Sequence, residues 1–265
     1  MSDKRPAIGR KLRRAIAGLA LLCAVDAVVE PHLLVVSHHA RSAPTKRVRV
    51  AHLSDLHTGG FGLRERKLVA RVAEERPDLI AITGDTVDEG DLEVARPVLT
   101  ALAALKPPLG VVAVHGNWEH WRPVRGDARA FYASTGVRFL DNESVKVRDD
   151  LWIVGLDDPF AGHADVATAF ARVPANVATI ALMHAPIGHP AIDGRATIAL
   201  AGHTHGGQVR VPWFGPLWRP PGSGDYDRGW YEGKTPLHVS SGSGTSVLRV
   251  RFACLPEIAI LDLGG

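Results

Sequence analysis

Five short apolar runs in this chain each end on side chains that can bind a metal ion. The runs cover residues 48–53, 79–82, 111–114, 180–183 and 198–201, and they lead respectively to Asp55 and His57, to Asp85, to Asn117, to His184, and to His203 and His205. Short β-branched runs of this kind are typical of buried strands. In open α/β sheets, ligands bind in the crevice beyond the carboxyl ends of the strands. The pattern therefore predicts that these seven side chains meet in one site.

The seven side chains offer nitrogen and oxygen donors and no thiolate. Such a set suits manganese, iron or zinc in a reactive site better than a structural zinc. Asp55 and His57 are two residues apart, so on an extended strand they would share a face and reach the same ion. His203 and His205 repeat this spacing. The carboxylate of Asp85 has two oxygens and can bridge two ions. We therefore expect two divalent metal ions, Mn²⁺ in the first place, with Zn²⁺ or Fe as alternatives.

The charge of such a site indicates its substrate. Two divalent ions bring four positive charges, whereas Asp55 and Asp85 bring two negative ones. The remaining positive field favours a phosphate group. Two ions about 3.5–4 Å apart can generate a hydroxide nucleophile at neutral pH and hold the phosphoryl oxygens during in-line displacement. The residues thus predict a di-metal phosphohydrolase.

These residues also form a known set of motifs. The set consists of Asp55-x-His57, Gly84-Asp85, Gly116-Asn117, His184 and Gly202-His203-x-His205, in this order. It resembles the calcineurin-like metallophosphoesterases over residues 47–263. Residues 54–57, 201–208 and 240–258 are most similar to the membrane-associated bacterial branch, which includes phosphodiesterases and the UDP-2,3-diacylglucosamine pyrophosphatases of lipid A synthesis.

The resemblance implies a fold, an activity and roles for the residues. The fold is an α/β four-layer αββα sandwich. The activity is hydrolysis of a phosphodiester or pyrophosphate bond by a metal-bound hydroxide, in a phosphorylated small-molecule, lipid-linked or UDP-sugar substrate. One metal would be held by Asp55, His57 and His205, the other by Asn117, His184 and His203, with Asp85 bridging the two.

One position departs from the family pattern. The family reads Gly-Asn-His followed by Glu or Asp, whereas this chain has Trp118 between Asn117 and Glu119. The missing histidine normally contacts the scissile phosphate and helps the leaving group depart. An indole cannot act as an acid at neutral pH, and loss of a general acid costs about 10²–10⁴-fold in rate.

Several interpretations of this departure stay open. His120 or Glu119 could supply the proton, and His120 is kept with Asn117 as a candidate catalytic residue. His120 could instead be a surface residue while Trp118 fills space or contacts substrate. The substrate could also have a leaving group that needs no acid, such as a nucleoside monophosphate. A different class of function is a degenerate member that binds metal or phosphate as a scaffold.

The chain of 265 residues divides into an N-terminal segment, residues 1–46, and a catalytic domain, residues 47–265. The first 14 residues carry six Lys or Arg and one Asp, so the rest has a net charge of −2 within the total of +3. The basicity therefore belongs to the tail, and we expect no nucleic-acid partner.

An apolar segment of 15 residues, 15–29, follows the basic cluster and is short for a bilayer span of about 20 residues. It could be a signal-anchor, an export signal, an interfacial helix or a soluble helix packed on the domain. We expect a membrane-associated protein, with the cytoplasmic or exported face left open. Residues 37–46 are interpreted as a polar linker.

Strands and helices are expected to alternate in the first half of the domain. The strands are 47–53, 78–83 and 109–114, and the helices are 63–76, 91–105 and 124–135. The second half is expected to be mostly strands: 144–148, 151–156, 177–183, 196–201, 207–211, 237–240, 247–252 and 257–262.

In the long loop 212–233, the side chains of Trp213, Phe214 and Trp218 could form an apolar rim for a lipid-like substrate, dip into a membrane or pack within the loop. Asp88 is expected to make a turn or cap a helix.

Overall fold

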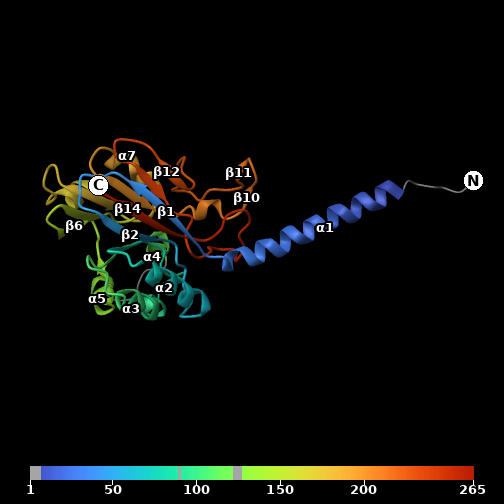
Figure 1. Ribbon diagram of the computed structural model, residues 1–265, viewed down its shortest axis with the longest axis horizontal. Coiled ribbons are helices and arrows are strands. Elements are labelled where there is room, and N and C mark those ends of the chain that lie inside the picture. Colours follow the sequence, from blue (N-terminus) through green and yellow to red (C-terminus); the bar gives the residue numbers. More distant parts are fainter. Residues whose placement is uncertain (1–6, 89–90, 122–126) are drawn as a thin grey trace, which may run out of the picture.

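The apolar runs form the central strands of two six-stranded sheets (Figure 1). The computed structural model describes residues 7–88, 91–121 and 127–265. The first sheet has the order β1 (Val35–Arg41), β14 (Glu257–Leu263), β2 (Val48–Leu53), β3 (Leu79–Thr83), β4 (Val111–Val114) and β5 (Arg138–Phe139). The second has the order β12 (Gly229–Tyr231), β13 (Leu237–Val239), β9 (Ile198–Ala201), β8 (Ala178–Leu182), β7 (Leu151–Gly155) and β6 (Glu143–Arg148). A separate small hairpin pairs β10 (Arg210–Val211) with β11 (Gly215–Pro216).

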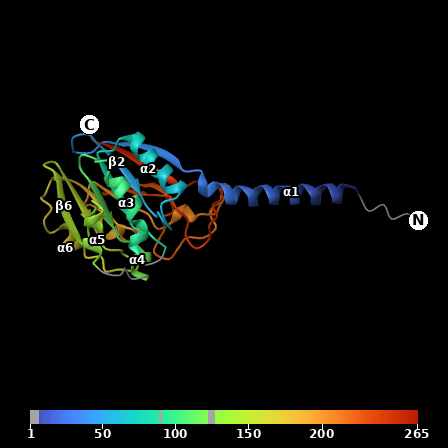
Figure 2. The same cartoon turned by 90° about the horizontal axis from the view of Figure 1, so that it is seen from below.

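Helices cover the outer face of each sheet (Figures 1 and 2). The first sheet carries α2 (Leu63–Glu75), α3 (Arg96–Ala103), which follows the short 3₁₀ turn η2 (Leu92–Ala95), and α5 (Ala128–Ser134). The second sheet carries α6 (Val166–Phe170) and α7 (His189–Ile192). Three apolar cores result: one under α2, α3 and α5, one between the two sheets, and one under α6 and α7. The predicted four-layer αββα sandwich is confirmed.

The central strands are parallel, so their carboxyl ends lie at one edge of each sheet. β2 pairs with β3 and β3 with β4 in parallel, as do β7 with β8 and β8 with β9. Every residue of β3, β4, β8 and β9 is buried, as expected for strands covered on both faces. The short α4 (Asn117–Trp121) begins immediately after the loop that follows β4.

Two expected elements are wrong. The predicted linker over 37–46 begins with β1, which pairs in parallel with β14 along its whole length. This edge strand is half-exposed and carries Ser, His and Arg, so its sequence lacks the apolar signal of a buried strand. The strand predicted at 247–252 is irregular, apart from a single bridge between Val209 and Phe252. The predicted helix 124–135 is seen as α5, and residues 124–126 lie outside the described part.

The N-terminal segment is a longer helix than its apolar residues indicated. α1 (Ala7–Val29) has 23 residues and projects away from the domain (Figures 1 and 2). Within it and the next turn, the stretch Arg13–His32 is long and apolar enough to cross a membrane. The helix is longer than the 15-residue apolar segment because it continues through the basic residues that precede this segment. Lys4 and Arg5 of the basic cluster lie outside the described residues.

Candidate metal centre

The structure brings all seven predicted ligands together at the strand ends. Two buried groups have donor atoms within 4.8 Å of one another: Asp55, His57, Asp85 and His205 in one, and Asp85, His184 and His203 in the other. Asp85 belongs to both groups, which is the position expected of a bridging ligand. The Oδ1 atom of Asn117 lies 3.1 Å from His184 Nε2 and 2.7 Å from His203 Nδ1, so it joins the second group.

The local geometry differs from the extended strand predicted for the paired ligands. Asp55 and His57 have φ of 52° and 42°, and Asp85, His203 and His205 have φ of 49°, 71° and 49°. These are left-handed conformations, which are uncommon for residues other than glycine and gather at functional sites. The ligands therefore lie on loops just beyond the strands. The amides of Asp55 and His57 donate to the carbonyl oxygens of Gly84 and Asp85, which locks the two loops together.

Two glycines in the motifs are required by close packing around the aspartates. A Cβ atom on Gly116 would lie 2.3 Å from Asp85 Oδ1, and one on Gly202 would lie 1.7 Å from Ser54 Oγ and 2.5 Å from Asp55 Oδ2. Gly202 thus allows the chain to approach so closely that the next amide, of His203, donates to both oxygens of Asp55. Any side chain at these positions would displace a candidate ligand.

A hydrogen bond to the backbone indicates which nitrogen of His184 faces the site. His184 Nδ1 lies 2.6 Å from the Thr83 carbonyl oxygen, which can only accept, so Nδ1 carries a proton. Burial opposes protonation of His184, yet Asp85 raises the pKa of this ring well above its ordinary value, so Nε2 also carries a proton in the absence of a metal ion and faces Asp85 Oδ2, 3.0 Å away. A cation bound between Nε2, Asp85 and Asn117 would displace that proton.

His203 repeats this arrangement with the opposite ring nitrogen. Its Nε2 lies 2.7 Å from the Pro221 carbonyl oxygen and donates to it, so the lone pair is on Nδ1, which faces Asn117 Oδ1. Burial, with a further effect of His184, lowers the pKa of His203 to about 3, so the ring is neutral at pH 7. The residues of the second group therefore fit a divalent cation.

The first group contains a residue whose role the sequence did not reveal. His57 Nε2 lies 3.0 Å from His205 Nε2, while His57 Nδ1 lies 2.6 Å from Asp88 Oδ1. A carboxylate on the far nitrogen of a metal-binding histidine fixes the ring and raises the basicity of the other nitrogen. Asp88 lies in a bend of the chain, and its contact with His57 is an additional role that the sequence analysis did not assign to it. Its position three residues after Asp85 was the available signal.

Burial keeps His205 in the form that binds metals. Burial, followed by the neighbouring His57, lowers the pKa of His205 well below its ordinary value. His205 is therefore neutral at pH 7, and its Nε2 lies 3.3 Å from Asp55 Oδ1. Against the effect of burial, Asp88 and Asp85 raise the pKa of His57, so a metal ion bound here would displace a proton from its Nε2. The first group thus combines carboxylates and imidazoles, which also fits a divalent cation.

Neither candidate acid of the Trp118 region enters the site. The buried carboxylate of Glu119 accepts the amide N–H groups of Asp85, Thr86 and Gly116, so it holds the loops after β3 and β4. His120 Nε2 contacts Asp157 Oδ1 at 2.6 Å, and His120 is not among the described residues that line the adjoining cavity. Its position does not support the interpretation of His120 as the general acid.

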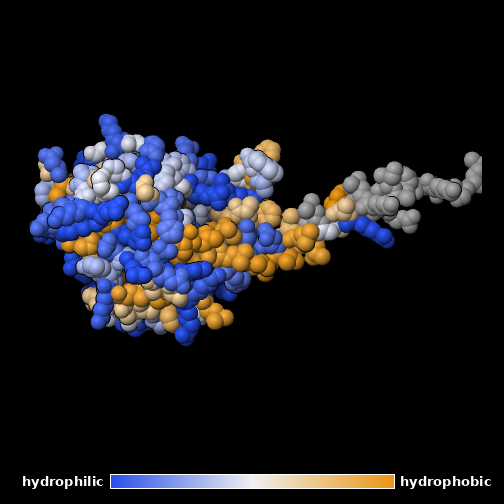
Figure 3. All heavy atoms as spheres, viewed as in Figure 1, coloured by the Kyte–Doolittle hydropathy of each residue, from blue (hydrophilic) through white to orange (hydrophobic). Residues whose placement is uncertain are grey.

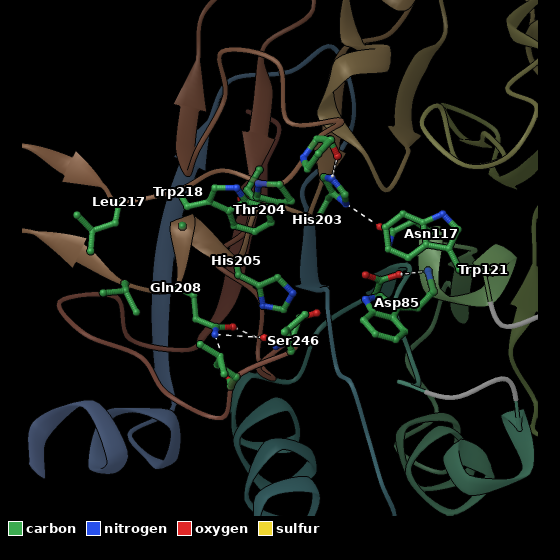
Figure 4. Close-up of a pocket in the computed structure, with 17 residues that line it drawn as sticks. Asp85, Asn117, Trp121, His203, Thr204, His205, Gln208, Leu217, Trp218 and Ser246 are labelled. Atoms are coloured by element: carbon green, nitrogen blue, oxygen red, sulfur yellow. Dashed lines mark hydrogen bonds between the residues drawn. The ribbon is translucent and has the colours of Figure 1, made fainter. Parts of the chain in front are cut away.

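A cavity of about 400 Å³ adjoins the centre (Figure 4). Asp85, Asn117, His203 and His205 contribute its polar part, and Trp118 lies in its wall. Figure 4 shows Asp85, Asn117 and Trp121 on one side, and Leu217 and Trp218 on the other. Cavities of this size bind small ligands, and their specificity comes from a few polar groups in an apolar lining.

Four exposed apolar side chains line this cavity, and we call them the apolar rim. The rim consists of Leu217, Trp218, Val247 and Leu248, which are 63–85% exposed. Trp213 and Phe214 lie on the neighbouring β10–β11 hairpin and are not among the described residues that line the cavity. Packing within the loop, one of the interpretations of Trp213 and Phe214, is wrong, because these two side chains are 100% and 89% exposed.

A buried arginine that the sequence did not single out for this role supports the loop beneath Asp55. Arg251 is fully buried, and its guanidinium donates to the carbonyl oxygens of Ser241, Gly242 and Gly244. The amide of Gly244 in turn donates to the Asp55 carbonyl oxygen at 2.7 Å. An arginine within an apolar segment was the only signal in the sequence.

Comparison with known proteins agrees with this geometry. The family model described as calcineurin-like phosphoesterase matches residues 48–207. The metallophosphoesterase YkuE of Bacillus subtilis (strain 168) is 28% identical and aligns over 89% of this chain and 87% of its own. The UDP-2,3-diacylglucosamine pyrophosphatase LpxG of Chlamydia muridarum is 26% identical over 88% of this chain and 90% of its own. The phosphodiesterase YaeI of Escherichia coli (strain K12) is 30% identical over 81% and 82%.

The chain therefore belongs to the calcineurin-like phosphoesterase family, and it is a phosphohydrolase.

Proposed function

We propose that this protein is a membrane-associated, dinuclear phosphohydrolase that cleaves a phosphodiester or pyrophosphate bond in a lipid-linked or UDP-sugar substrate. The observation that carries the proposal is the pair of Asp/His groups that share Asp85 beside a cavity with an apolar rim. Asp55, His57 and His205 would hold one ion, and Asn117, His184 and His203 the other. Mn²⁺ is the proposed ion.

The two ions would supply Lewis acidity to the phosphoryl group and lower the pKa of the attacking water. Backbone carbonyl oxygens orient His184 and His203, and the carboxylate of Glu119 holds the loops after β3 and β4. The ligands are therefore already in position, so little reorganisation is needed during the reaction. Trp118 contributes an apolar face to the cavity, and its amide donates to Asp85 Oδ1 at 2.9 Å.

The cavity favours substrates with good leaving groups. Among its described lining residues, the ionisable side chains are Asp85, His203 and His205, and all three are proposed ligands. None of them is then free to protonate a departing oxygen. A nucleoside monophosphate that leaves from a pyrophosphate bond needs no such proton. The pyrophosphatase activity in the name of LpxG, a relative of this chain, supports the same substrate class.

The lipid part of the proposal rests on where the apolar rim lies. The carbonyl oxygen of Ala27 in α1 accepts the amide of Arg251, and Glu30 accepts the amide of Cys254, so α1 is joined to the segment that carries Val247 and Leu248. Figure 3 shows hydrophobic residues continuing from α1 onto this end of the domain. A membrane that receives α1 would therefore face the mouth of the cavity, and an acyl chain could reach the rim from the bilayer.

The activity is tested first with bis-(p-nitrophenyl) phosphate and added Mn²⁺, because its good leaving group needs no acid. We expect hydrolysis that depends on Mn²⁺ and is lost in Asp85→Asn, which removes the shared charge. A folded, Mn²⁺-loaded protein without activity would contradict the proposal and favour a scaffold that binds metal or phosphate.

The substrate class is tested separately by comparing UDP-2,3-diacylglucosamine in mixed micelles with UDP-N-acetylglucosamine in solution. We expect kcat/KM to be higher for the acylated substrate, and Leu217→Ser to reduce that preference while the rate with bis-(p-nitrophenyl) phosphate is kept. Equal kcat/KM values for the two UDP-sugars would contradict the lipid-linked part of the proposal alone.

A further inference from the structure

A second cluster of metal-type side chains lies between the two sheets, apart from the candidate dinuclear centre. It consists of His39 on β1, Glu257 on β14 and His238 on β13, whose donor atoms lie within 4.8 Å of one another. β1 and β14 belong to the first sheet, whereas β13 belongs to the second. His238 is fully buried, and His39 and Glu257 are partly buried. The family motifs include none of the three residues in a metal role.

Hydrogen bonds indicate which nitrogen of His238 is free. His238 Nδ1 lies 3.1 Å from His52 Nδ1, so one of these two nitrogens donates to the other. The Nε2 atom of His238 is buried and has no hydrogen-bond partner among the described residues. This nitrogen is therefore the one that is open to a ligand.

Hydrogen bonds also orient the other two residues. Ser37 Oγ donates its single proton to Glu257 Oε1, so it accepts from His39 Nε2, which is 3.0 Å away. The lone pair of His39 is therefore on Nδ1. The other oxygen of Glu257 accepts the amide of Ser241 at 3.0 Å. Hydrogen bonds of this kind orient the ligands in metal sites.

The cluster combines two imidazoles and one carboxylate, and its His238 Nε2 atom has no partner among the described residues. Burial lowers the pKa of His238 to about 4 against the opposing effect of Glu257, so this ring does not carry a proton at pH 7. His39, His238 and Glu257 also line a surface cavity of about 600 Å³, which leaves room for water at a further coordination position. Two histidines, one glutamate and a water form a common zinc ligand set.

We propose that His39, His238 and Glu257 bind one Zn²⁺ ion at a site separate from the dinuclear centre. The ion would join the edge strand β1, which follows α1, to β14 in the same sheet and to β13 in the opposite sheet. It would therefore fasten the membrane-proximal strand to the domain. The proposal shares no residue with the proposed function and can fail or hold independently of it.

The experiment counts Zn²⁺ ions in the full chain, purified in detergent, stripped with EDTA, loaded with Zn²⁺ and passed through a desalting column. We expect three ions per wild-type chain and two in His39→Ala and in Glu257→Gln. His38→Ala is the matched control, because His38 is the neighbouring, exposed residue of the same strand and contacts Glu75 instead. This variant should keep three ions.

Asp85→Asn separates the two kinds of site, since it removes the ligand common to the dinuclear groups and leaves the cluster intact. Asp85→Asn should lose ions of the dinuclear centre and keep the ion of the cluster, whereas His39→Ala should lose the ion of the cluster and keep those of the dinuclear centre. A thermal melt with and without Zn²⁺ shows that each variant is folded. If both His39→Ala and Glu257→Gln bind as many Zn²⁺ ions as wild type and His38→Ala, the proposal is overturned.

Discussion

Trp118 occupies the cavity at the position where the family motif has a histidine. We expect Trp118→His to accelerate hydrolysis of a diester with a poor leaving group, such as phenol, by about 10²-fold or more, because it restores an acid beside the leaving oxygen. Bis-(p-nitrophenyl) phosphate should gain much less. The measurement is kcat/KM for a series of aryl diesters of increasing leaving-group pKa.

The control for this prediction is His120→Ala. Because His120 is held by Asp157 outside the cavity lining, the variant should leave the dependence on leaving-group pKa unchanged. A loss confined to poor leaving groups would instead identify His120 as the acid. Equal acceleration of all diesters by Trp118→His would show that the indole only obstructs the cavity.

Asp88 gives a second prediction at the level of one side chain. Asp88→Asn removes the charge that orients His57, so we expect the affinity for Mn²⁺ to fall about 10–100-fold. Titration of activity with Mn²⁺ measures this change. Asp91→Asn is the matched control, because Asp91 caps the turn η2 with an oxygen that asparagine retains. Equal Mn²⁺ affinities for Asp88→Asn and wild type would show that the contact has no role.

The identities of the ligands could be predicted from sequence, but their conformations could not. A strand that ends on Asp, Asn or His is visible as an apolar run, and parallel strands carry such ends to one edge. The left-handed backbone of Asp55 and His203 could not be predicted, because the modest preference of Asp and His for this region does not decide it and the loops that lock one another do. Asp88 and Asp157 act through partners distant in sequence, and Arg251 acts through backbone carbonyl oxygens that carry no residue-type signal, so their roles appear only in the folded chain.

Among the elements, the loop 240–246 depends on the side chain of Arg251. Arg251→Met removes the donor from the carbonyl oxygens of Ser241, Gly244 and Cys254, whereas that of Gly242 keeps the amide of Glu257. Each such loss costs about 1–3 kcal/mol. We expect a decrease of at least about 3 kcal/mol in the free energy of unfolding, together with weaker metal binding through Asp55. Urea unfolding measures the first effect. Arg249→Met, an exposed neighbour, should change it little; similar losses in both variants would contradict the prediction.

The β10–β11 hairpin gives a prediction about membranes. Trp213 and Phe214 are 100% and 89% exposed, and transfer of one such side chain from water contributes about 1.5–3 kcal/mol. The test uses a chain that lacks residues 1–26 and therefore keeps the Ala27 and Glu30 contacts. In this chain, we expect the double substitution Trp213→Ser and Phe214→Ser to reduce the partition coefficient into phosphatidylglycerol vesicles about 100-fold or more. Vesicle sedimentation measures it. Unchanged partition would show that α1 alone attaches the protein.

Elements with strong periodicity were predictable, and those at edges were not. The buried strands β2, β3, β4, β8 and β9 follow from continuous apolar runs, and α2 from its helical spacing. The polar face of β1 makes it look like a linker, because only its pairing with β14 makes it a strand. The apolar residues at 247–252 suggested a strand, yet there the chain places Val247 and Leu248 in the rim and buries Arg251.

For the whole molecule, the proposed metal ions should stabilise the fold as well as the reaction. An ion present at about 100 times its dissociation constant adds about 2.7 kcal/mol at each site. In a domain of this size, that corresponds to a decrease of about 5–10 °C in Tm per site when EDTA removes the metal. Differential scanning calorimetry measures it, and Asp85→Asn should show a smaller EDTA effect. A Tm that EDTA does not change would contradict metal binding by the folded state.

The order of the first sheet also constrains how the chain folds as it is made. β14, residues 257–263, lies between β1 and β2, which are separated from it by some 200 residues of sequence. Until the ribosome has added β14, β1 has no partner strand and β2 has one open edge. Sheets built from such distant pairs form slowly. The first sheet is therefore completed only when residues 257–263 have left the ribosome, and β1 is the last strand of the domain to gain a partner.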